Sequence, residues 1–227
     1  MSLVELPNGS KLYVESRGLA TAHAIVFVHS VGADRRMWDP LLDVKPNELN
    51  RNSGSSCLSP IVNIPLSVES HAQDLDLLIR HLNLESPSIV GHSLGSFVSA
   101  EYAVGDQGSI SQLLLISSLL SPRAKPARAA QKKTVAKIRE AQSVEPVVES
   151  SIQALVGQPS TNALALSYSC VLMLAQSPDG YASNLAASSD FDEHIEVEKL
   201  EIPVLVINGG RDFIAGDGSR LSQAIRG

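Results

Sequence analysis

The sequence predicts an α/β fold in which a mostly parallel central sheet is flanked by helices. Short apolar segments rich in Val, Ile and Leu have the composition of parallel strands that are covered on both faces. Helical patterns separate these segments, and a long stretch before the last of them has helical patterns only. The four expected buried strands are residues 24–28, 88–91, 113–116 and 203–208.

The arrangement of these segments predicts one core with an inserted helical cap. We expect residues 1–120 and 191–227 to form the core and residues 121–190 to form the cap, where no strand pattern is found. Helix-breaking residues divide the cap into separate helices. These are Pro122, Pro126, Pro146, Pro159 and Pro178.

Two local patterns predict the start of the core. Alternating apolar residues on either side of Pro7-Asn8-Gly9-Ser10 predict a hairpin of two edge strands over residues 4–16, because Asn-Gly is a strong turn signal. Ser70 and Gln73 fit a capping box at the start of a helix. The apolar face of this helix is expected to consist of Leu75, Leu78, Ile79 and Leu82.

Composition excludes several classes of function. The formal net charge of −6 argues against binding to nucleic acid, which requires a basic face. No apolar run approaches the roughly 20 residues of a membrane helix, and the N-terminus lacks the pattern of a signal peptide. The two cysteines, Cys57 and Cys170, have no spacing typical of a zinc site or a disulfide framework. We therefore expect a soluble, cytoplasmic protein without a metal.

The segment Gly91-His92-Ser93-Leu94-Gly95 matches the pattern G-x-S-x-G between a buried strand and an apolar helix. The glycines leave room for a sharp turn, and the amides and dipole at the start of the following helix favour a developing oxyanion. Ser93 is therefore the candidate nucleophile. The alternative is a tight turn between strand and helix in which Ser93 has no catalytic role.

A candidate acid follows the last predicted strand. Asp212 comes after Gly209-Gly210-Arg211, at a strand end that could present a carboxylate to orient a catalytic histidine. Asp217, between two glycines, is expected to be a turn residue. His29, which follows the first buried strand, is expected to be a buried, hydrogen-bonded residue that orients its loop.

Together these residues resemble the α/β-hydrolase family of the AB hydrolase-1 type, and within it small esterases and lactonases such as 3-oxoadipate enol-lactonases. The resemblance covers residues 4–43 and 66–227. Besides the G-x-S-x-G segment it is carried by Met-Trp-Asp-Pro at 37–40, Ser-Val-Glu-Ser at 67–70 and Ser-Pro-Asp-Gly-Tyr at 177–181.

The resemblance implies roles for several residues. Ser93 would be the nucleophile and Asp212 the acid, while the amides of Leu94 and of Ser30 or Val31 would form the oxyanion hole. A small ester or lactone would be the substrate, and no cofactor, metal, nucleic acid or membrane is implied. The oligomeric state is left open.

The same resemblance suggests contacts to the substrate. His29, Trp38 and His92 are the candidate substrate-binding residues. The alternative role of Trp38 is packing behind the loop at residues 29–32. The alternative role of His29 is to orient that loop.

The family places its catalytic histidine after the acid, but no histidine follows Asp212 here. The last strand and helix of the family are also missing, which suggests a C-terminal truncation. Loss of one triad member leaves roughly 10³- to 10⁴-fold catalysis from the oxyanion hole and binding. All six histidines precede the acid: His23, His29, His71, His81, His92 and His194.

A second departure lies at residues 43–65, where the family has a core strand. The sequence there is typical of a loop, and only residues 61–64 could form a short strand. We therefore expect a sheet that lacks a strand beside its centre and exposes apolar edges. Our interpretation is that both departures come from an altered gene model or splice product.

Three functions stay open: a carboxylic-ester or lactone hydrolase with an acyl-enzyme on Ser93, an impaired member with a ligand- or partner-binding role, and a cofactor-free haloperoxidase or carbon–carbon hydrolase. A basic run in the expected cap is typical of a solvated helix face, or would form a positive rim for anionic substrates such as carboxylated lactones. This run is Arg123, Lys125, Arg128, Lys132, Lys133, Lys137 and Arg139.

Overall fold

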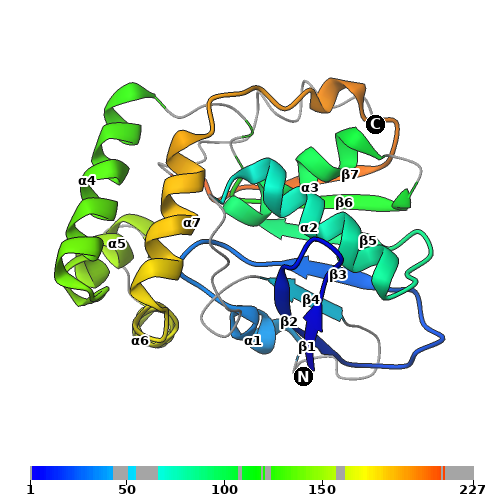
Figure 1. Cartoon of the computed structure of the whole chain (residues 1–227), viewed down its shortest axis with the longest axis horizontal. Coiled ribbons are helices and arrows are strands. Elements are labelled where there is room, and N and C mark those ends of the chain that lie inside the picture. The colour runs from blue at the N-terminus through cyan, green and yellow to red at the C-terminus, as the bar shows by residue number, and fades with distance from the viewer. Residues whose placement is uncertain are drawn as a thin grey trace.

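The computed structural model describes residues 2–42, 51–54, 66–106, 109–118, 120, 124–156, 162–210 and 212. Within them, seven strands form one sheet in the order β1-β2-β4-β3-β5-β6-β7 (Figure 1). The strands are β1 (Ser2–Glu5), β2 (Lys11–Ser16), β3 (Ile25–Val28), β4 (Arg51–Gly54), β5 (Ser88–His92), β6 (Gln112–Ile116) and β7 (Val204–Ile207).

The four predicted strands are confirmed as β3, β5, β6 and β7, but the predicted burial of β7 is wrong, because Leu205 and Ile207 are about half exposed. They pair in parallel, with Phe27 opposite Val90 and Leu114 opposite Leu205. Ile89 is fully buried, as expected for an apolar side chain in a strand covered on both faces. Parallel pairing brings the carboxyl ends of these strands to one edge of the sheet, where the predicted site residues follow.

The predicted gap in the sheet is wrong, because residues 51–54 form β4. This strand pairs antiparallel with β2, where Ser53 faces Val14, and parallel with β3, where Asn52 faces Phe27. Backbone hydrogen bonds from two neighbours define a strand even where the side chains are polar. As a result β2 is an interior strand and only β1 of the hairpin is an edge. Residues 61–64 lie outside the described part.

The predicted hairpin is confirmed. β1 and β2 pair antiparallel, and Gly9 has φ +86 in the turn between them. The side-chain oxygen of Asn8 accepts a hydrogen bond of 3.1 Å from the amide of Ser10. This local bond and the positive φ explain why Asn-Gly closes the turn.

Helix α2 (Val68–His81) has its N-cap three residues before Ser70, where the sequence predicts it. Ser67 is its N-cap: the Ser67 hydroxyl accepts the amide of Ser70 at 3.0 Å, and the Ser70 hydroxyl accepts the amide of Ser67 at 2.9 Å. Serine takes the place of the usual Glu or Gln at the third helical position, so the motif is reciprocal but shorter. Gln73 has no part in it.

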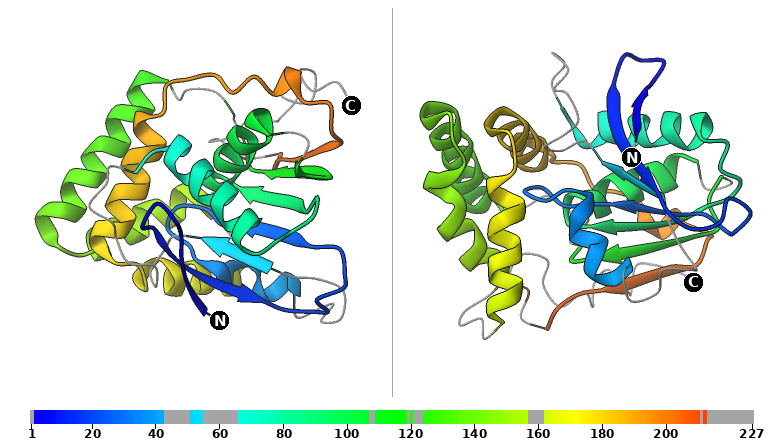
Figure 2. Two further views of the ribbon diagram at one scale, coloured as in Figure 1. Left: turned by 45° about the vertical axis from the view of Figure 1, so that its right-hand side comes forward. Right: turned by 90° about the horizontal axis from the view of Figure 1, so that it is seen from below.

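Two layers of helix cover the sheet. α2 and α3 (Leu94–Gly105) pack on one face, over a core that includes Ile79, Phe97 and Leu113. The 3₁₀ turn η1 (Arg35–Trp38) and α1 (Asp39–Leu42) lie on the other face, as Figure 2 shows. A 3₁₀ turn, η3 (Val197–Lys199), precedes β7.

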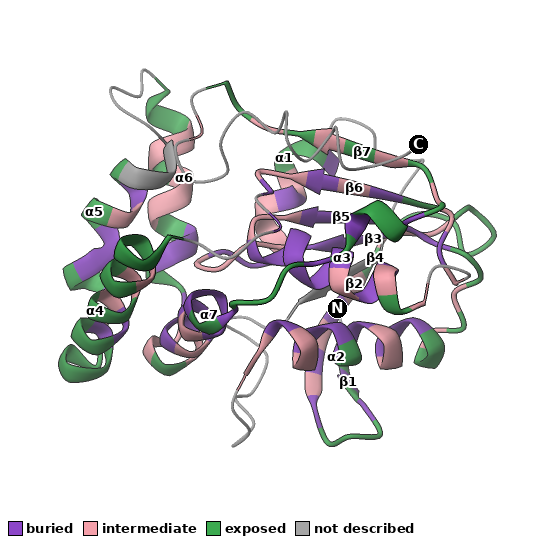
Figure 3. Cartoon of the chain, turned by 90° about the horizontal axis from the view of Figure 1, so that it is seen from above, coloured by how far each residue is buried: buried purple, intermediate pink, exposed green. Residues whose placement is uncertain are grey.

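Four helices occupy the expected cap segment and lie beside the carboxyl ends of the strands (Figures 1 and 3). They are α4 (Lys125–Ala141), α5 (Glu145–Val156), α6 (Ala163–Leu174) and α7 (Pro178–Asp190). Their shared apolar cluster includes Ile138, Met173 and Leu185.

The cap prolines act differently from the prediction. Pro126, Pro146 and Pro178 lie in the first turns of α4, α5 and α7. A proline is favourable there because the first amides of a helix have no intrahelical acceptor. These three residues therefore begin helices, while Pro122 and Pro159 lie outside the described residues. In the described part of the chain, no helix is both long and apolar enough to cross a membrane.

Candidate active site

Ser93 stands on a strained turn between β5 and α3. Its φ of 53° and ψ of −115° lie where residues with a side chain rarely occur. Such a conformation costs on the order of 1–3 kcal/mol and persists only where the surroundings impose it. The Ser93 amide donates to the carbonyl of Ile116 on β6 at 2.9 Å, which ties the turn to the neighbouring strand.

The two glycines of the motif are required by close backbone contacts. A Cβ atom on Gly91 would lie 2.4 Å from the carbonyl oxygen of Gly95, and one on Gly95 would lie 2.2 Å from the carbonyl oxygen of Val28. Both distances are far below any van der Waals contact. The glycines therefore let the start of α3 approach β3 and β5, as the sequence predicted for a sharp turn.

The buried hydroxyl of Ser96 is hydrogen-bonded to the backbone of this turn. Ser96, on the first turn of α3, donates to the carbonyl of Ser93 at 2.6 Å and shares a 2.8 Å hydrogen bond with the hydroxyl of Ser118. Both hydroxyls are almost fully buried. Sequence reasoning missed Ser96 and Ser118, because small polar residues in a helix and a loop carry no distinguishing pattern.

Ser93 lines a cavity of about 740 Å³ between the core and the cap helices. Asp212, His92, Ser30 and Val31 line the same cavity, so the structure brings together five of the predicted site residues. The cap contributes one wall through residues from α6 and its N-cap: Asn162, Leu164, Ala165, Tyr168, Ser169, Leu172 and Met173.

His92 precedes Ser93 and contacts Trp38 edge to face, with ring centroids 6.4 Å apart. Burial lowers the pKa of His92 to about 4, although the charge of Asp212 acts in the opposite direction. The imidazole is therefore neutral near pH 7. Trp38 itself is buried against Phe27, with ring centroids 5.0 Å apart, and it is not among the residues that line the cavity.

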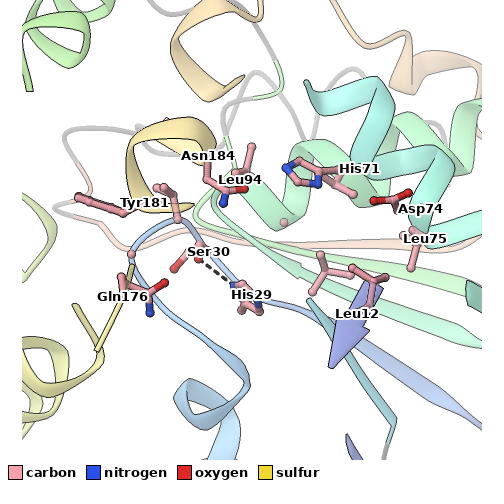
Figure 4. A pocket seen from close by; sticks show the side chains of 15 residues that line it. Leu12, His29, Ser30, His71, Asp74, Leu75, Leu94, Gln176, Tyr181 and Asn184 are labelled. Atoms are coloured by element: carbon pink, nitrogen blue, oxygen red, sulfur yellow. Dashed lines mark hydrogen bonds between the residues drawn. The ribbon is translucent and has the colours of Figure 1, made fainter. Parts of the chain in front are cut away.

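Leu94 and His29 line a second, small cavity of about 50 Å³ behind the loop at residues 29–32, seen in Figure 4. Nδ1 of His29 donates to the carbonyl of Ser30 at 3.0 Å. Burial lowers the pKa of His29. Its ring does not line the larger cavity.

A cap helix rests directly on this loop. Gly32 has φ +75, and a Cβ atom there would lie 3.0 Å from the ring of Tyr181 on α7. In Figure 4, Asn184 of the same helix lies near His71 of α2. Burial lowers the pKa of His71, and the charge of Asp74 and a hydrogen bond with Asn184 oppose that shift. The cap and the core thus share buried polar contacts as well as apolar ones.

The match to a family model decides what this arrangement is. The model described as alpha/beta hydrolase fold matches residues 50–224, which is most of the chain. The chain belongs to that family. The predicted family and fold are therefore confirmed. The prediction that the last strand and helix of the family are missing concerns a part of the chain outside the described residues.

Solved structures share the fold of this α/β-hydrolase chain at low sequence identity. A hydrolase from Pseudomonas aeruginosa PA01 is 19% identical, with a TM-score of 0.87 over 100% of this chain and 87% of that one. The enol-lactonase from Burkholderia xenovorans LB400 is 22% identical, with a TM-score of 0.88 over 100% and 88%. A thermophilic esterase from Thermogutta terrifontis is 20% identical, with a TM-score of 0.84 over 99% and 87%. No curated protein matches the sequence.

All six histidines of this α/β-hydrolase chain are described, and of them only His92 lines the larger cavity. His23 bonds Ser88 at 2.8 Å at the start of β5, and His194 is 3.8 Å from Glu198. His81 ends α2. Among the described residues, no group of three or more His, Cys, Asp or Glu could bind a metal ion.

Sequence reasoning missed the wall that α6 contributes. The helix has the sequence ALALSYSCVLML, which is apolar on nearly every side. Such a helix in a surface cap indicates that more than one of its faces contacts apolar surroundings or a ligand. This signal could have pointed to Tyr168, Leu172 and Met173. Ser117, which also lines the cavity and has φ 51, carried no signal.

Proposed function

We propose that the chain is a serine hydrolase that cleaves small carboxylic esters or lactones through an acyl-enzyme on Ser93. The observation that carries the proposal is the strained Ser93 at the wall of a large cavity that Asp212 also lines. Neighbours that are named a hydrolase, an enol-lactonase and an esterase support the reaction class.

The proposed reaction has two steps. The Ser93 oxygen attacks the carbonyl carbon, the bond to the alcohol group breaks, and the alcohol leaves with a proton; water then attacks the acyl-enzyme and releases the acid. The amides of Leu94 and of Ser30 or Val31 stabilise the oxyanion. Leu94 is the first residue of α3, where amides have no intrahelical acceptor.

The histidines favour a second candidate, an impaired member that binds ligands with slow turnover. Of the described histidines only His92 lines the cavity, and the neutral His92 is a weak proton acceptor because burial lowers its pKa to about 4. Loss of a triad member costs orders of magnitude in kcat. The turnover number of the purified protein distinguishes the two candidates.

The test compares the purified protein with its Ser93→Ala variant on 4-nitrophenyl butyrate, benzyl butyrate and γ-butyrolactone. The matched control is Ser150→Ala, which removes an exposed hydroxyl from α5 that bonds only locally to the carbonyl of Val147. We expect the wild type and the control to hydrolyse these substrates and the Ser93→Ala variant not to do so. We also expect a fluorophosphonate to label Ser93 in the wild type and the control, as detected by mass spectrometry. Equal rates in Ser93→Ala and the wild type would refute the proposal.

A further inference from the structure

The described lining of the larger cavity carries no basic side chain other than His92. Its described lining contains no lysine and no arginine, and its two charged side chains are the carboxylates of Asp39 and Asp212. His92 is neutral near pH 7, because burial lowers its pKa to about 4. A carboxylate on the substrate would thus find no counter-ion among these residues.

Two described arginines that lie beside the lining residue Asp39 are already paired. Arg17 bonds Asp39 at 2.8 Å and Glu15 at 2.6 Å, and Arg35 also pairs with Glu15 and lies 3.9 Å from Asp39. These two guanidinium groups and two carboxylates balance one another. The group therefore adds little net potential to the cavity.

The basic residues of the cap lie elsewhere. Arg128 donates to the carbonyl of Ser189 at 2.8 Å, and Lys132 pairs with Asp190 at 2.8 Å, so both bind the end of α7. None of the described residues of α4 lines the cavity. Of the two interpretations of this basic run, the positive rim for anionic substrates thus has no support in these contacts.

The cavity walls are mostly apolar. Met37 of the core and Leu164, Leu172 and Met173 of α6 all line the cavity, and the volume of about 740 Å³ accommodates a ligand of moderate size. Pockets lined in this way gain affinity from burial of apolar ligand surface, and a few polar groups set the orientation. Here those polar groups include Tyr168, which lines the same cavity as Ser93.

We infer that the site takes uncharged esters or lactones with apolar groups and discriminates against carboxylated ones. This inference rests on the proposed function and names its substrate class. A carboxylate would lose hydration in an apolar cavity and meet the acidic side chain of Asp212, both of which weaken binding. We expect a preference of about tenfold or more for the uncharged member of a matched pair, which corresponds to 1.4 kcal/mol.

The test uses benzyl butyrate and monobenzyl succinate, which differ by a methyl group against a carboxylate. Calorimetric titration of Ser93→Ala measures binding without turnover, and product analysis with the wild type measures kcat/KM. We expect benzyl butyrate to bind about tenfold more tightly or better. Equal affinities, a preference for monobenzyl succinate, or binding of neither ester overturns the inference.

A charge insertion in the same Ser93→Ala background sharpens the test. Leu164 lines the cavity and is 79% exposed, so Leu164→Lys can place an ammonium group at the cavity without disturbing the core. The matched control is Leu174→Lys on the same helix, at a residue that is 50% exposed and does not line the cavity.

We expect Leu164→Lys to raise the affinity for monobenzyl succinate several-fold, with a gain that added salt reduces, and Leu174→Lys to leave it unchanged. No gain in Leu164→Lys, or the same gain in both variants, contradicts the inference. If the wild type hydrolyses neither ester while Ser93→Ala still prefers benzyl butyrate, the proposed function fails and the polarity of the site stands.

Discussion

A Cβ atom on Gly95 would lie 2.2 Å from the carbonyl oxygen of Val28. The first turn of α3 thus contacts the backbone of β3 directly, and neither backbone can give way without moving a central strand. Because Ser93 lies two residues before this contact, the position of Ser93 depends on a residue without a side chain.

This contact predicts that Gly95→Ala is strongly destabilising, by about 3 kcal/mol or more, because the added methyl meets backbone atoms rather than a mobile side chain. Urea unfolding followed by circular dichroism measures the change. The control is Gly105→Ala at the last residue of the same helix, where an added Cβ has nothing within 4 Å. We expect it to be neutral or to stabilise by up to about 1 kcal/mol. A loss of stability that is equal in the two variants would contradict the role of the contact.

The strain at Ser93 predicts that Ser93→Gly unfolds at a higher urea concentration than Ser93→Ala. Glycine adopts φ 53° and ψ −115° without steric cost, whereas alanine keeps the Cβ atom that causes the strain. We expect a difference of about 1–2 kcal/mol in the free energy of unfolding, since the greater chain entropy of glycine offsets part of the gain. Equal stability of the two variants would mean that the turn is not strained.

A hydrogen bond from a residue of the cavity wall joins α6 to η1. The hydroxyl of Tyr168 donates to the carbonyl of Arg36 at 2.6 Å. We predict that Tyr168→Phe lowers stability by about 0.5–1.5 kcal/mol and raises KM for benzyl butyrate a few-fold, because one cavity wall loses its tie to the core.

The matched control for Tyr168 is Tyr102→Phe. The hydroxyl of Tyr102 bonds that of Ser109 at 2.6 Å, and neither residue lines the larger cavity. A similar loss of stability is expected there, with KM unchanged. A rise in KM in both variants would show that the effect is not specific to the wall.

The buried histidines predict a loss of stability in acid. The folded pKa of His92, about 4, is below its ordinary value of 6.5, so between these values the unfolded chain binds more protons. The free energy of unfolding should therefore decrease as the pH falls from about 6.5 toward 4. His29 and His71, whose pKa values burial also lowers, act in the same direction.

Urea unfolding at pH 7 and pH 5 measures this dependence. We expect a smaller decrease for His92→Gln, which has no imidazole to protonate. His194→Gln is the control, because its side chain is exposed and lies on the surface near Glu198. If His92→Gln and His194→Gln show the same pH dependence as the wild type, His92 does not contribute to acid sensitivity.

Features that depend on a few neighbouring residues could be predicted from the sequence. Four apolar strands, the hairpin at Asn8-Gly9 and the sharp turn around Ser93 all follow from local composition and spacing, and the fold confirms them. Local signals suffice because strand burial, positive φ and the absence of a side chain are properties of a few adjacent residues.

The position of strand β4 and the composition of the cavity walls depend on contacts between distant parts of the chain. Residues 51–54 form a strand because β2 and β3 supply hydrogen bonds on both sides, although their composition is that of a loop. Asp212 reaches the cavity of Ser93 because parallel strands end at one edge, and α6 closes that cavity from a distant part of the chain. Backbone pairing and contacts between distant segments leave no periodic pattern in a sequence, so the position of this strand and the chemistry of the cavity wall appear only in the folded chain.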